Sequence, residues 1–281
     1  MKIKTICVCG AGTMGSGIAQ VAASSGFTTL LYDVNEQMLQ KAKAGIESSL
    51  EKLLLKEKIT ATAKQQAIEN ITYTHVTGDC IADVFIEAIV EKTEIKVSLF
   101  NQLAAINSSK SIFASNTSSL SITQLAAQIN GPERVLGLHF FNPAPLMKLV
   151  EVVKTNYNNE AIIALMVELV KAMQKIPVVC KDSPGFIVNR VARPYYIEAL
   201  RLAEEGLASF EDVDVLMEST GFKMGPFALM DLIGNDINYA VSCSVYEQMQ
   251  QPERLKPSYI QEQKVKAGEL GRKSGKGYYT Y

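Results

Sequence analysis

The first 33 residues alternate apolar runs with a glycine-rich segment of helical spacing. Residues 3–9 (IKTICVC) and 28–33 (TTLLYD) have the aliphatic and β-branched character of buried strands. Between them, residues 10–26 begin with closely spaced glycines and continue with apolar residues three and four positions apart. This order predicts a strand, a glycine turn, a helix and a second strand, which together open an α/β fold.

The same alternation continues to residue 182 and predicts a Rossmann-like, mostly parallel sheet. The further predicted elements, in chain order, are a long helix or helix pair at 35–59, a strand at 83–90, a helix from about Thr93 to Ile106, a strand at 111–116, a short helix from Ser121, strand-like runs at 134–141 and 148–155, a helix at 159–174 and a strand at 176–182.

From Phe186 onward the pattern becomes helical. Proline cannot continue the hydrogen bonding of a strand and glycine frees the backbone, so Asp182-Ser183-Pro184-Gly185 marks the boundary. We therefore expect a Rossmann-like domain at 1–183 and an all-helical C-terminal domain at 184–281, closed by a polar loop or short extended tail. The helical spacing is clearest in residues 188–206, 211–220 and 226–249.

Composition limits the class of protein. The 281 residues are 47% hydrophobic and 20% charged, which suits a large core and two domains. A formal net charge of −1 argues against nucleic acid or an anionic membrane as a partner. The first strand begins at once and no apolar run approaches membrane-spanning length, so we expect a cytoplasmic protein. The five scattered cysteines form neither a zinc spacing nor a disulfide framework, so no metal site is expected.

Gly10, Gly12 and Gly15 form a G-x-G-x-x-G motif between the first strand and the first helix, which is the position where this motif binds dinucleotides. The first glycine lets the chain turn, the second lets a pyrophosphate approach, and the third lets the helix pack on the sheet. Asp33 ends the second strand, where a carboxylate accepts both ribose hydroxyls and repels a 2′-phosphate. The motif therefore predicts NAD rather than NADP; a purely structural turn is the alternative.

The chain contains two histidines, which narrows the search for a general base. His75 lies in a polar connection (THVTGD) and is expected to be a solvated loop residue. His139 lies at the C-terminal end of an apolar strand, where open parallel sheets place ligand sites. Taken alone, His139 would more often be a satisfied core histidine.

Glu151 changes this interpretation because it stands in an otherwise apolar run. A buried carboxylate needs a cation or hydrogen-bond donors. If the strands of His139 and Glu151 are neighbours, the carboxylate can fix the imidazole tautomer and leave the other ring nitrogen free as a base. Beside a nicotinamide, this pair predicts oxidation of an alcohol to a ketone; a buried ion pair without chemistry is the alternative.

The chain resembles the short-chain L-3-hydroxyacyl-CoA dehydrogenase family, which includes the bacterial 3-hydroxybutyryl-CoA dehydrogenases. The resemblance spans almost the whole chain through GAGTMGSGIAQ, EAIVEKTEIK, ASNTSSL, GLHFFNPAPLMKLVEVV, DSPGFIVNR, MGPFALMDLIG and GRKSGKGYYTY. It implies reversible, NAD-dependent oxidation of an (S)-3-hydroxyacyl-CoA, with (S)-3-hydroxybutyryl-CoA as the expected substrate, to the 3-oxoacyl-CoA. It also implies a homodimer formed through the C-terminal helical domain and closure of that domain over the acyl-CoA.

The resemblance implies His139 as the catalytic base, Glu151 as its orienting partner, and Ser118, Asn142 and Asn189 as further catalytic residues. From sequence alone, Ser118 suits a helix cap and Asn142 a turn equally well. Expected cofactor contacts besides the glycines and Asp33 are Thr13, Met14, Glu91, Lys96, Asn116, Ser118, Asn142 and Lys273. Expected substrate contacts are Ser49, Lys56, Lys96, Ser118 and Asn189, although the lysine-rich segment around Lys56 also suits a solvated helix face.

Three alternatives remain open. Segments such as RVARPYYIEALRLAEEG look closer to the 3-hydroxyadipyl-CoA dehydrogenases, in which case Arg190, Arg193 or Arg201 would meet a distal carboxylate rather than bridge helices or meet coenzyme A. A crystallin-like structural protein resembles the same family, but the intact catalytic set argues against that role. A β-hydroxyacid dehydrogenase of similar plan would use a lysine where this chain offers a histidine and a glutamate.

Overall fold

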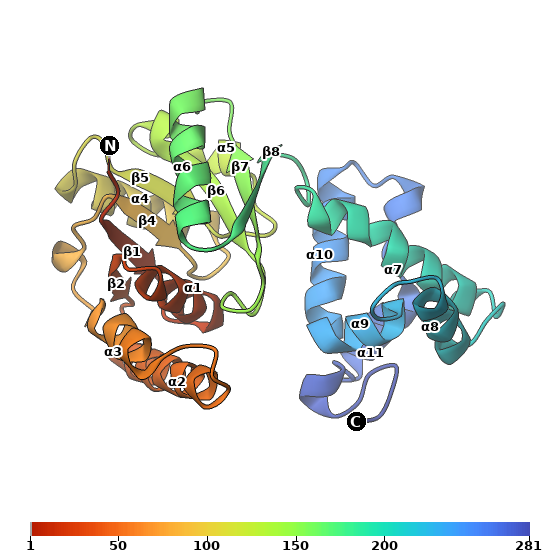
Figure 1. The fold of residues 1–281 in the computed structure, drawn as a ribbon. Helices are drawn as coiled ribbons and strands as arrows, with labels where there is room; N and C mark the ends of the chain where they lie inside the picture. The colour runs from red at the N-terminus through yellow and green to blue at the C-terminus, as the bar shows by residue number, and fades with distance from the viewer. Residues whose placement is uncertain (1) are drawn as a thin grey trace. The chain divides into compact units, whose positions relative to one another are not determined.

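The computed structural model describes residues 2–281, which divide after Asp182 into two compact units (Figure 1). The first unit combines an eight-stranded sheet with helices, and the second is built from helices. The predicted fold class, a Rossmann-like and mostly parallel sheet followed by a helical part, is confirmed. Within residues 2–281, no helix combines the length and the apolar composition needed to cross a membrane.

The sheet has the order β3-β2-β1-β4-β5-β6-β7-β8, and all neighbours are parallel except β6 and β7. The strand order reverses between β1 and β4, and such a switch point opens a ligand crevice at the carboxyl ends of the strands. The strands are β1 (Thr5–Cys9), β2 (Thr28–Tyr32), β3 (Ile71–Thr74), β4 (Val84–Glu87), β5 (Ile112–Ser115), β6 (Val135–Phe140), β7 (Leu149–Lys154) and β8 (Ile176–Lys181).

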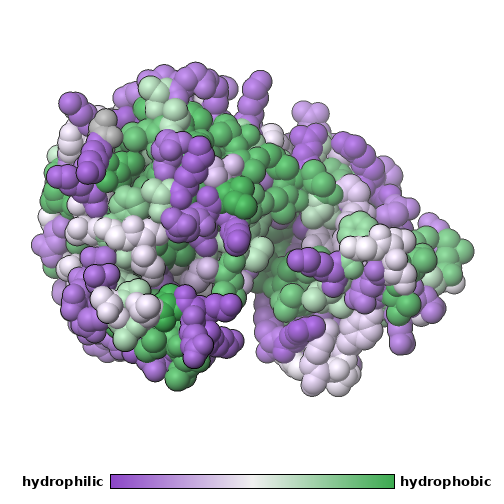
Figure 2. All heavy atoms as spheres, viewed as in Figure 1, coloured by the Kyte–Doolittle hydropathy of each residue, from purple (hydrophilic) through white to green (hydrophobic). Residues whose placement is uncertain are grey.

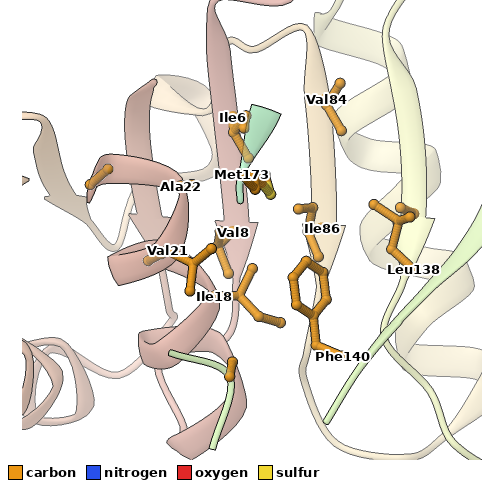
Figure 3. Close-up of a cluster of buried hydrophobic side chains, with 14 of the residues drawn as sticks. Ile6, Val8, Ile18, Val21, Ala22, Val84, Ile86, Leu138, Phe140 and Met173 are labelled. Atoms are coloured by element: carbon orange, nitrogen blue, oxygen red, sulfur yellow. The ribbon is translucent and has the colours of Figure 1, made fainter. Parts of the chain in front are cut away.

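Helices cover both faces of the sheet because alternate residues of each buried strand point to opposite sides. One core cluster joins Ile6, Val8 and Ile86 to α1, α2 and α6, and Figure 3 shows Ile18 and Val21 of α1 facing these strand residues. The opposite cluster contains the thiols of β1 and the phenylalanines of β4 and β5 against α4 and α5. The helices are α1 (Thr13–Ser24), α2 (Glu36–Leu55), α3 (Ala61–Glu69), α4 (Thr93–Ile106), α5 (Ile122–Ala126) and α6 (Glu160–Ala172).

The helical unit is closed by the C-terminal tail. Buried Asp231 accepts hydrogen bonds from the backbone N–H groups of Tyr278 and Tyr279 and from the Tyr281 hydroxyl. The run predicted as one helical stretch at 226–249 is two helices, because Gly234 adopts a φ of 103° between them. The helices are α7 (Val188–Glu204), α8 (Phe210–Ser219), α9 (Pro226–Ile233), α10 (Asn235–Gln248) and α11 (Tyr259–Lys266).

Candidate active site

The glycine turn lies where β1 passes into α1, and each glycine of the motif has different surroundings. A Cβ on Gly15 would lie 1.7 Å from the Gly10 carbonyl oxygen, and one on Gly10 would lie 2.6 Å from the Ala88 carbonyl oxygen. A Cβ on Gly12 would meet no atom within 4 Å. Gly10 and Gly15 are therefore required by packing, whereas the open space at Gly12 fits a cofactor pyrophosphate.

The start of α1 and the end of β2 meet at this turn. Thr13 and Met14 are the first residues of α1, whose N-cap, Gly12, has no side chain to occupy the free N–H groups. Asp33 Oδ2 accepts a hydrogen bond from the Ala11 N–H at 2.7 Å. Its Oδ1 accepts from the Asn35 N–H at 2.9 Å, and the carboxylate retains capacity to accept further hydrogen bonds.

His139 and Glu151 face each other across the antiparallel pair β6 and β7, where they are register partners. The His139 Nδ1 lies 2.7 Å from Glu151 Oε2, and both side chains are buried. On the other side of the ring, Nε2 lies 2.8 Å from the Ser118 hydroxyl, in the loop that follows β5. The structure therefore joins three of the five residues expected to be catalytic in one hydrogen-bonded chain.

The chemistry of Glu151 sets the protonation of this chain. When Glu151 is ionised it only accepts hydrogen bonds, and Nδ1 of His139 then carries the proton that it donates to Glu151. In the neutral ring, Nε2 is then an acceptor, and the Ser118 hydroxyl donates to it. This arrangement leaves Nε2 as the basic atom of the site.

Lys96 lies on α4 with 1% of its side chain exposed. Its Nζ is 2.5 Å from Glu87 Oε1 and 3.0 Å from Glu91 Oε2. Partial burial alone would raise the pKa of Glu91, but the charge of Lys96 and the hydrogen bonds from Thr117, Lys96 and Ser119 lower it overall. The ammonium of Lys96 is therefore enclosed by two carboxylates of its own chain.

A cavity of about 300 Å³ lies between the glycine turn, α2 and the loop between β6 and β7. It brings together residues expected to contact the cofactor, Gly12, Thr13 and Asn142, with Ser49, which was expected to contact the substrate. Lys56 caps the end of α2 as an exposed residue outside this lining. The cavity is therefore open to a ligand that extends from the glycine turn along α2.

Two polar residues order the loops around this cavity. Asn116 Oδ1 accepts a hydrogen bond from the Phe140 N–H at 2.8 Å, so this amide oxygen ties the end of β5 to β6. Lys175 Nζ donates to the carbonyl oxygens of Ala144 at 2.6 Å and Met147 at 2.8 Å, in the loop that also carries Asn142. Lys175 was not predicted from the sequence, because a single lysine between a helix and a strand gives no distinctive pattern.

The remaining predicted residues have local partners. Lys273 Nζ forms an ion pair with Asp236 Oδ1 at 2.5 Å within the helical unit. Asn189 lies in the first turn of α7. His75 is half-exposed and lies 3.2 Å from Glu36 Oε1.

The three arginines differ in their contacts. Arg193 is buried and donates to the Asn238 carbonyl oxygen and the Ser242 hydroxyl, and burial lowers its pKa to about 10. Arg201 donates to the carbonyl oxygen of Glu253. Arg190 is exposed and is the one of the three that faces solvent.

The reversed strand order, the glycine turn and the buried histidine–glutamate pair define an NAD-binding protein of the dehydrogenase class. Residues 5–183 match the family model "3-hydroxyacyl-CoA dehydrogenase, NAD binding domain", and residues 185–281 match "3-hydroxyacyl-CoA dehydrogenase, C-terminal domain". The chain belongs to the 3-hydroxyacyl-CoA dehydrogenase family. The resemblance noted in the sequence and the choice of NAD as cofactor are thereby confirmed.

Individual relatives of this chain are also named as hydroxyacyl-CoA dehydrogenases. The chain is 46% identical over its whole length to 3-hydroxyadipyl-CoA dehydrogenase of Escherichia coli, of which it spans 60%. It is 43% identical to the mitochondrial hydroxyacyl-coenzyme A dehydrogenase of Sus scrofa, covering 99% of this chain and 91% of that one. The crystal structure of (S)-3-hydroxybutyryl-CoA dehydrogenase from Ralstonia eutropha superimposes with a TM-score of 0.95 at 39% identity, covering 100% and 99% of the two chains.

Proposed function

We propose that this protein catalyses the reversible, NAD-dependent oxidation of an (S)-3-hydroxyacyl-CoA to the 3-oxoacyl-CoA, with (S)-3-hydroxybutyryl-CoA as the expected substrate. The observation that carries the proposal is the chain from Glu151 through His139 to Ser118. It lies at the carboxyl edge of the sheet that also bears the glycine turn. Membership of the 3-hydroxyacyl-CoA dehydrogenase family supports the same activity.

In the oxidation, His139 acts as the general base. Its Nε2 takes the proton of the substrate's 3-hydroxyl, and Glu151 stabilises the imidazolium through the Nδ1–H that it already binds. The Ser118 hydroxyl turns its hydrogen bond from Nε2 to the 3-oxygen and keeps that atom beside the base. NAD⁺, when bound, supplies the acceptor for the hydride that leaves carbon 3. In the reverse direction, Nε2 of His139 returns its proton to the 3-oxygen.

The cofactor is held by the glycine turn. The open space at Gly12 and the free N–H groups at the start of α1 suit the pyrophosphate, and Asp33 suits the adenosine ribose. A 2′-phosphate beside Asp33 would be repelled, which favours NADH over NADPH. We assign Ser49, which lines the cavity that begins at Gly12, to the coenzyme A portion of the substrate. We assign Lys56, the exposed C-cap of the same helix, to the phosphates of coenzyme A.

A 3-hydroxyadipyl-CoA is the second candidate substrate. The 46% identity to the Escherichia coli 3-hydroxyadipyl-CoA dehydrogenase favours it, and Arg190 is the arginine with an exposed side chain that could meet a distal carboxylate. Arg193 and Arg201 already donate to oxygens of the helical unit, so they are less suited to that role.

Catalytic efficiency with NADH tests the function and separates the two substrates. We expect turnover of acetoacetyl-CoA, and kcat/KM compared among acetoacetyl-CoA, longer 3-oxoacyl-CoAs and 3-oxoadipyl-CoA ranks the acyl chains. If 3-oxoadipyl-CoA ranks first, Arg190→Gln should reduce kcat/KM for that substrate and spare acetoacetyl-CoA. Absence of turnover with every 3-oxoacyl-CoA would contradict the proposed activity and favour a crystallin-like structural role.

We further propose that the protein is a homodimer formed through its helical unit. Large apolar side chains there are half or more exposed, and Figure 2 shows hydrophobic residues reaching the surface of this unit. Leu232, Ile233 and Ile237, which are 50%, 37% and 49% exposed, lie around the break between α9 and α10. Clustered exposed apolar residues are typical of an interface between subunits.

A further inference from the structure

Glu87 is a fully buried carboxylate at the carboxyl end of β4, next to the point where the strand order reverses. Its Oε1 accepts hydrogen bonds from Lys96 Nζ at 2.5 Å and from the Ile89 N–H at 2.7 Å. Its Oε2 accepts from the Ser115 hydroxyl at 2.6 Å, on the neighbouring strand β5. A buried charge is costly unless it is paired and hydrogen-bonded, and here both oxygens are engaged.

Two paths lead from Glu87 to the backbone beside Ser118. In the first, Lys96 Nζ binds both Glu87 and Glu91, and Glu91 Oε1 accepts from the hydroxyl of Thr117. In the second, the Ser115 hydroxyl that donates to Glu87 also accepts from the Thr117 N–H at 3.3 Å. Thr117 is therefore fixed by its side chain and by its backbone.

The residue after Ser118 is held by the same carboxylate. Ser119 Oγ donates to Glu91 Oε1 at 2.9 Å, and Thr117 Oγ1 accepts from the N–H groups of Ser119 and Leu120 at 3.2 and 2.9 Å. Glu91 thus accepts hydrogen bonds from the residues on both sides of Ser118. The Ser118 hydroxyl itself lies 2.8 Å from His139 Nε2. Together these hydrogen bonds restrict movement of the loop that carries Ser118.

We propose that Glu87, Lys96 and Glu91 form a charged clamp that positions Ser118 against His139, with Glu87 as its buried anchor. This inference rests on the proposed function, in which Ser118 and His139 handle the 3-oxygen of the substrate. Glu87 has no exposed surface, so it acts through the loop rather than by touching substrate or cofactor. Lys96 pairs with both carboxylates and so links Glu87 to Glu91. Glu87 was not predicted from the sequence, whereas Glu91 and Lys96 were expected as contacts of the cofactor and gain a positioning role here.

Nitrogen NMR of the imidazole tests the clamp without substrate. The chain has two histidines, so a His75→Gln background leaves His139 as the single source of imidazole signals. Ser118→Ala should move the Nε2 resonance toward that of a ring nitrogen without a hydrogen bond. We expect Glu87→Gln to move it in the same direction, because the clamp loosens while the side chain keeps its size. The matched control is Glu160→Gln, which removes an exposed ion pair with Lys154 and should leave the resonance unchanged.

Measurements of kcat and of the Kd of NADH provide a second test of the clamp. Glu87→Gln should lower kcat by about 10- to 100-fold, as expected when a reacting group is displaced, with the Kd of NADH nearly unchanged. In a Ser118→Ala background, Glu87→Gln should change kcat less than about twofold, because the Ser118 hydroxyl that the clamp positions is already absent. Multiplicative losses, or an unmoved Nε2 resonance, would overturn the clamp.

The two arms also separate this inference from the proposed function. A wild-type protein that oxidises no NADH with 3-oxoacyl-CoAs contradicts the proposed function, and the NMR arm still decides whether Glu87 positions Ser118. If Glu87→Gln does not fold, Thr117→Val replaces it in both arms. That variant removes the hydroxyl that donates to Glu91 and leaves the three charged residues in place. It should give the same shift in Nε2 and the same dependence on Ser118.

Discussion

At the scale of single residues, two glycines of the glycine turn have different roles: Gly15 is required by packing, and Gly12 leaves space for a ligand. Gly15 has no room for a methyl group because the Gly10 carbonyl oxygen occupies its place, whereas Gly12 borders space that no protein atom fills. Both residues belong to one motif, yet they serve different purposes. The same substitution at the two positions therefore gives different outcomes.

Gly12→Ala should fold with nearly wild-type thermal stability and bind NADH more weakly by about 1–3 kcal/mol, the usual cost of an overpacked contact. Gly15→Ala should lose about 3 kcal/mol or more of unfolding free energy, because neither the oxygen nor the helix can yield by enough. Denaturant titration and NADH fluorescence titration measure the two effects. Equal losses of stability in both variants would contradict the division of roles.

Glu87 and Glu151 show what the sequence reveals about a residue and what it does not. Both stand alone in apolar strands, and that signal identified Glu151 because a histidine on a nearby strand gave it a partner. Glu87 also stands alone in an apolar strand, but no sequence pattern singles out its partners, Lys96 on a helix and Ser115 on a parallel strand. A buried charge can thus be found from sequence, while its partners depend on the tertiary structure.

At the scale of elements, long and periodic segments followed the sequence closely. The alternation of strands and helices up to residue 182, the long α2 and helices α7 and α8 match the apolar pattern. The short elements β3, α3 and α11 were not predicted, because their mixed composition gives weak periodicity and packing against neighbours stabilises them. The break at Gly234 was also missed, since a glycine inside a helical pattern is usually tolerated.

The tail is an element whose stability depends on pH. Hydrogen bonds from Lys264 and Lys276 lower the pKa of Glu269 to about 2. These contacts stabilise the folded state fully above the ordinary carboxyl pKa of about 4.5 and are lost as the pH falls through about 2. Glu269→Gln should therefore lower Tm at pH 7, and the difference from wild type should shrink steadily below pH 4.5. Calorimetry of both proteins across this range measures it; a constant difference would contradict the assigned pKa.

At the scale of the whole molecule, the proposed dimer places its interface on the helical unit. Wild-type protein should sediment at twice the 30.7 kDa mass of the chain. Ile237→Glu, at an exposed apolar position of α10, should shift the population toward monomer. Leu55→Glu, at an exposed position of the first unit, is the matched control and should leave the assembly intact. A monomeric wild type, or a dimer unaffected by Ile237→Glu, would contradict this interface.

A pair of histidine variants tests whether His139 moves the substrate's proton. His139→Gln should reduce the kcat of NADH oxidation with acetoacetyl-CoA by about 10²- to 10⁴-fold, as expected for loss of a general acid–base group, with the Kd of NADH largely preserved. His75→Gln, at the half-exposed histidine of the same unit, should retain wild-type turnover. Near-normal kcat in His139→Gln would show that His139 is not the general base.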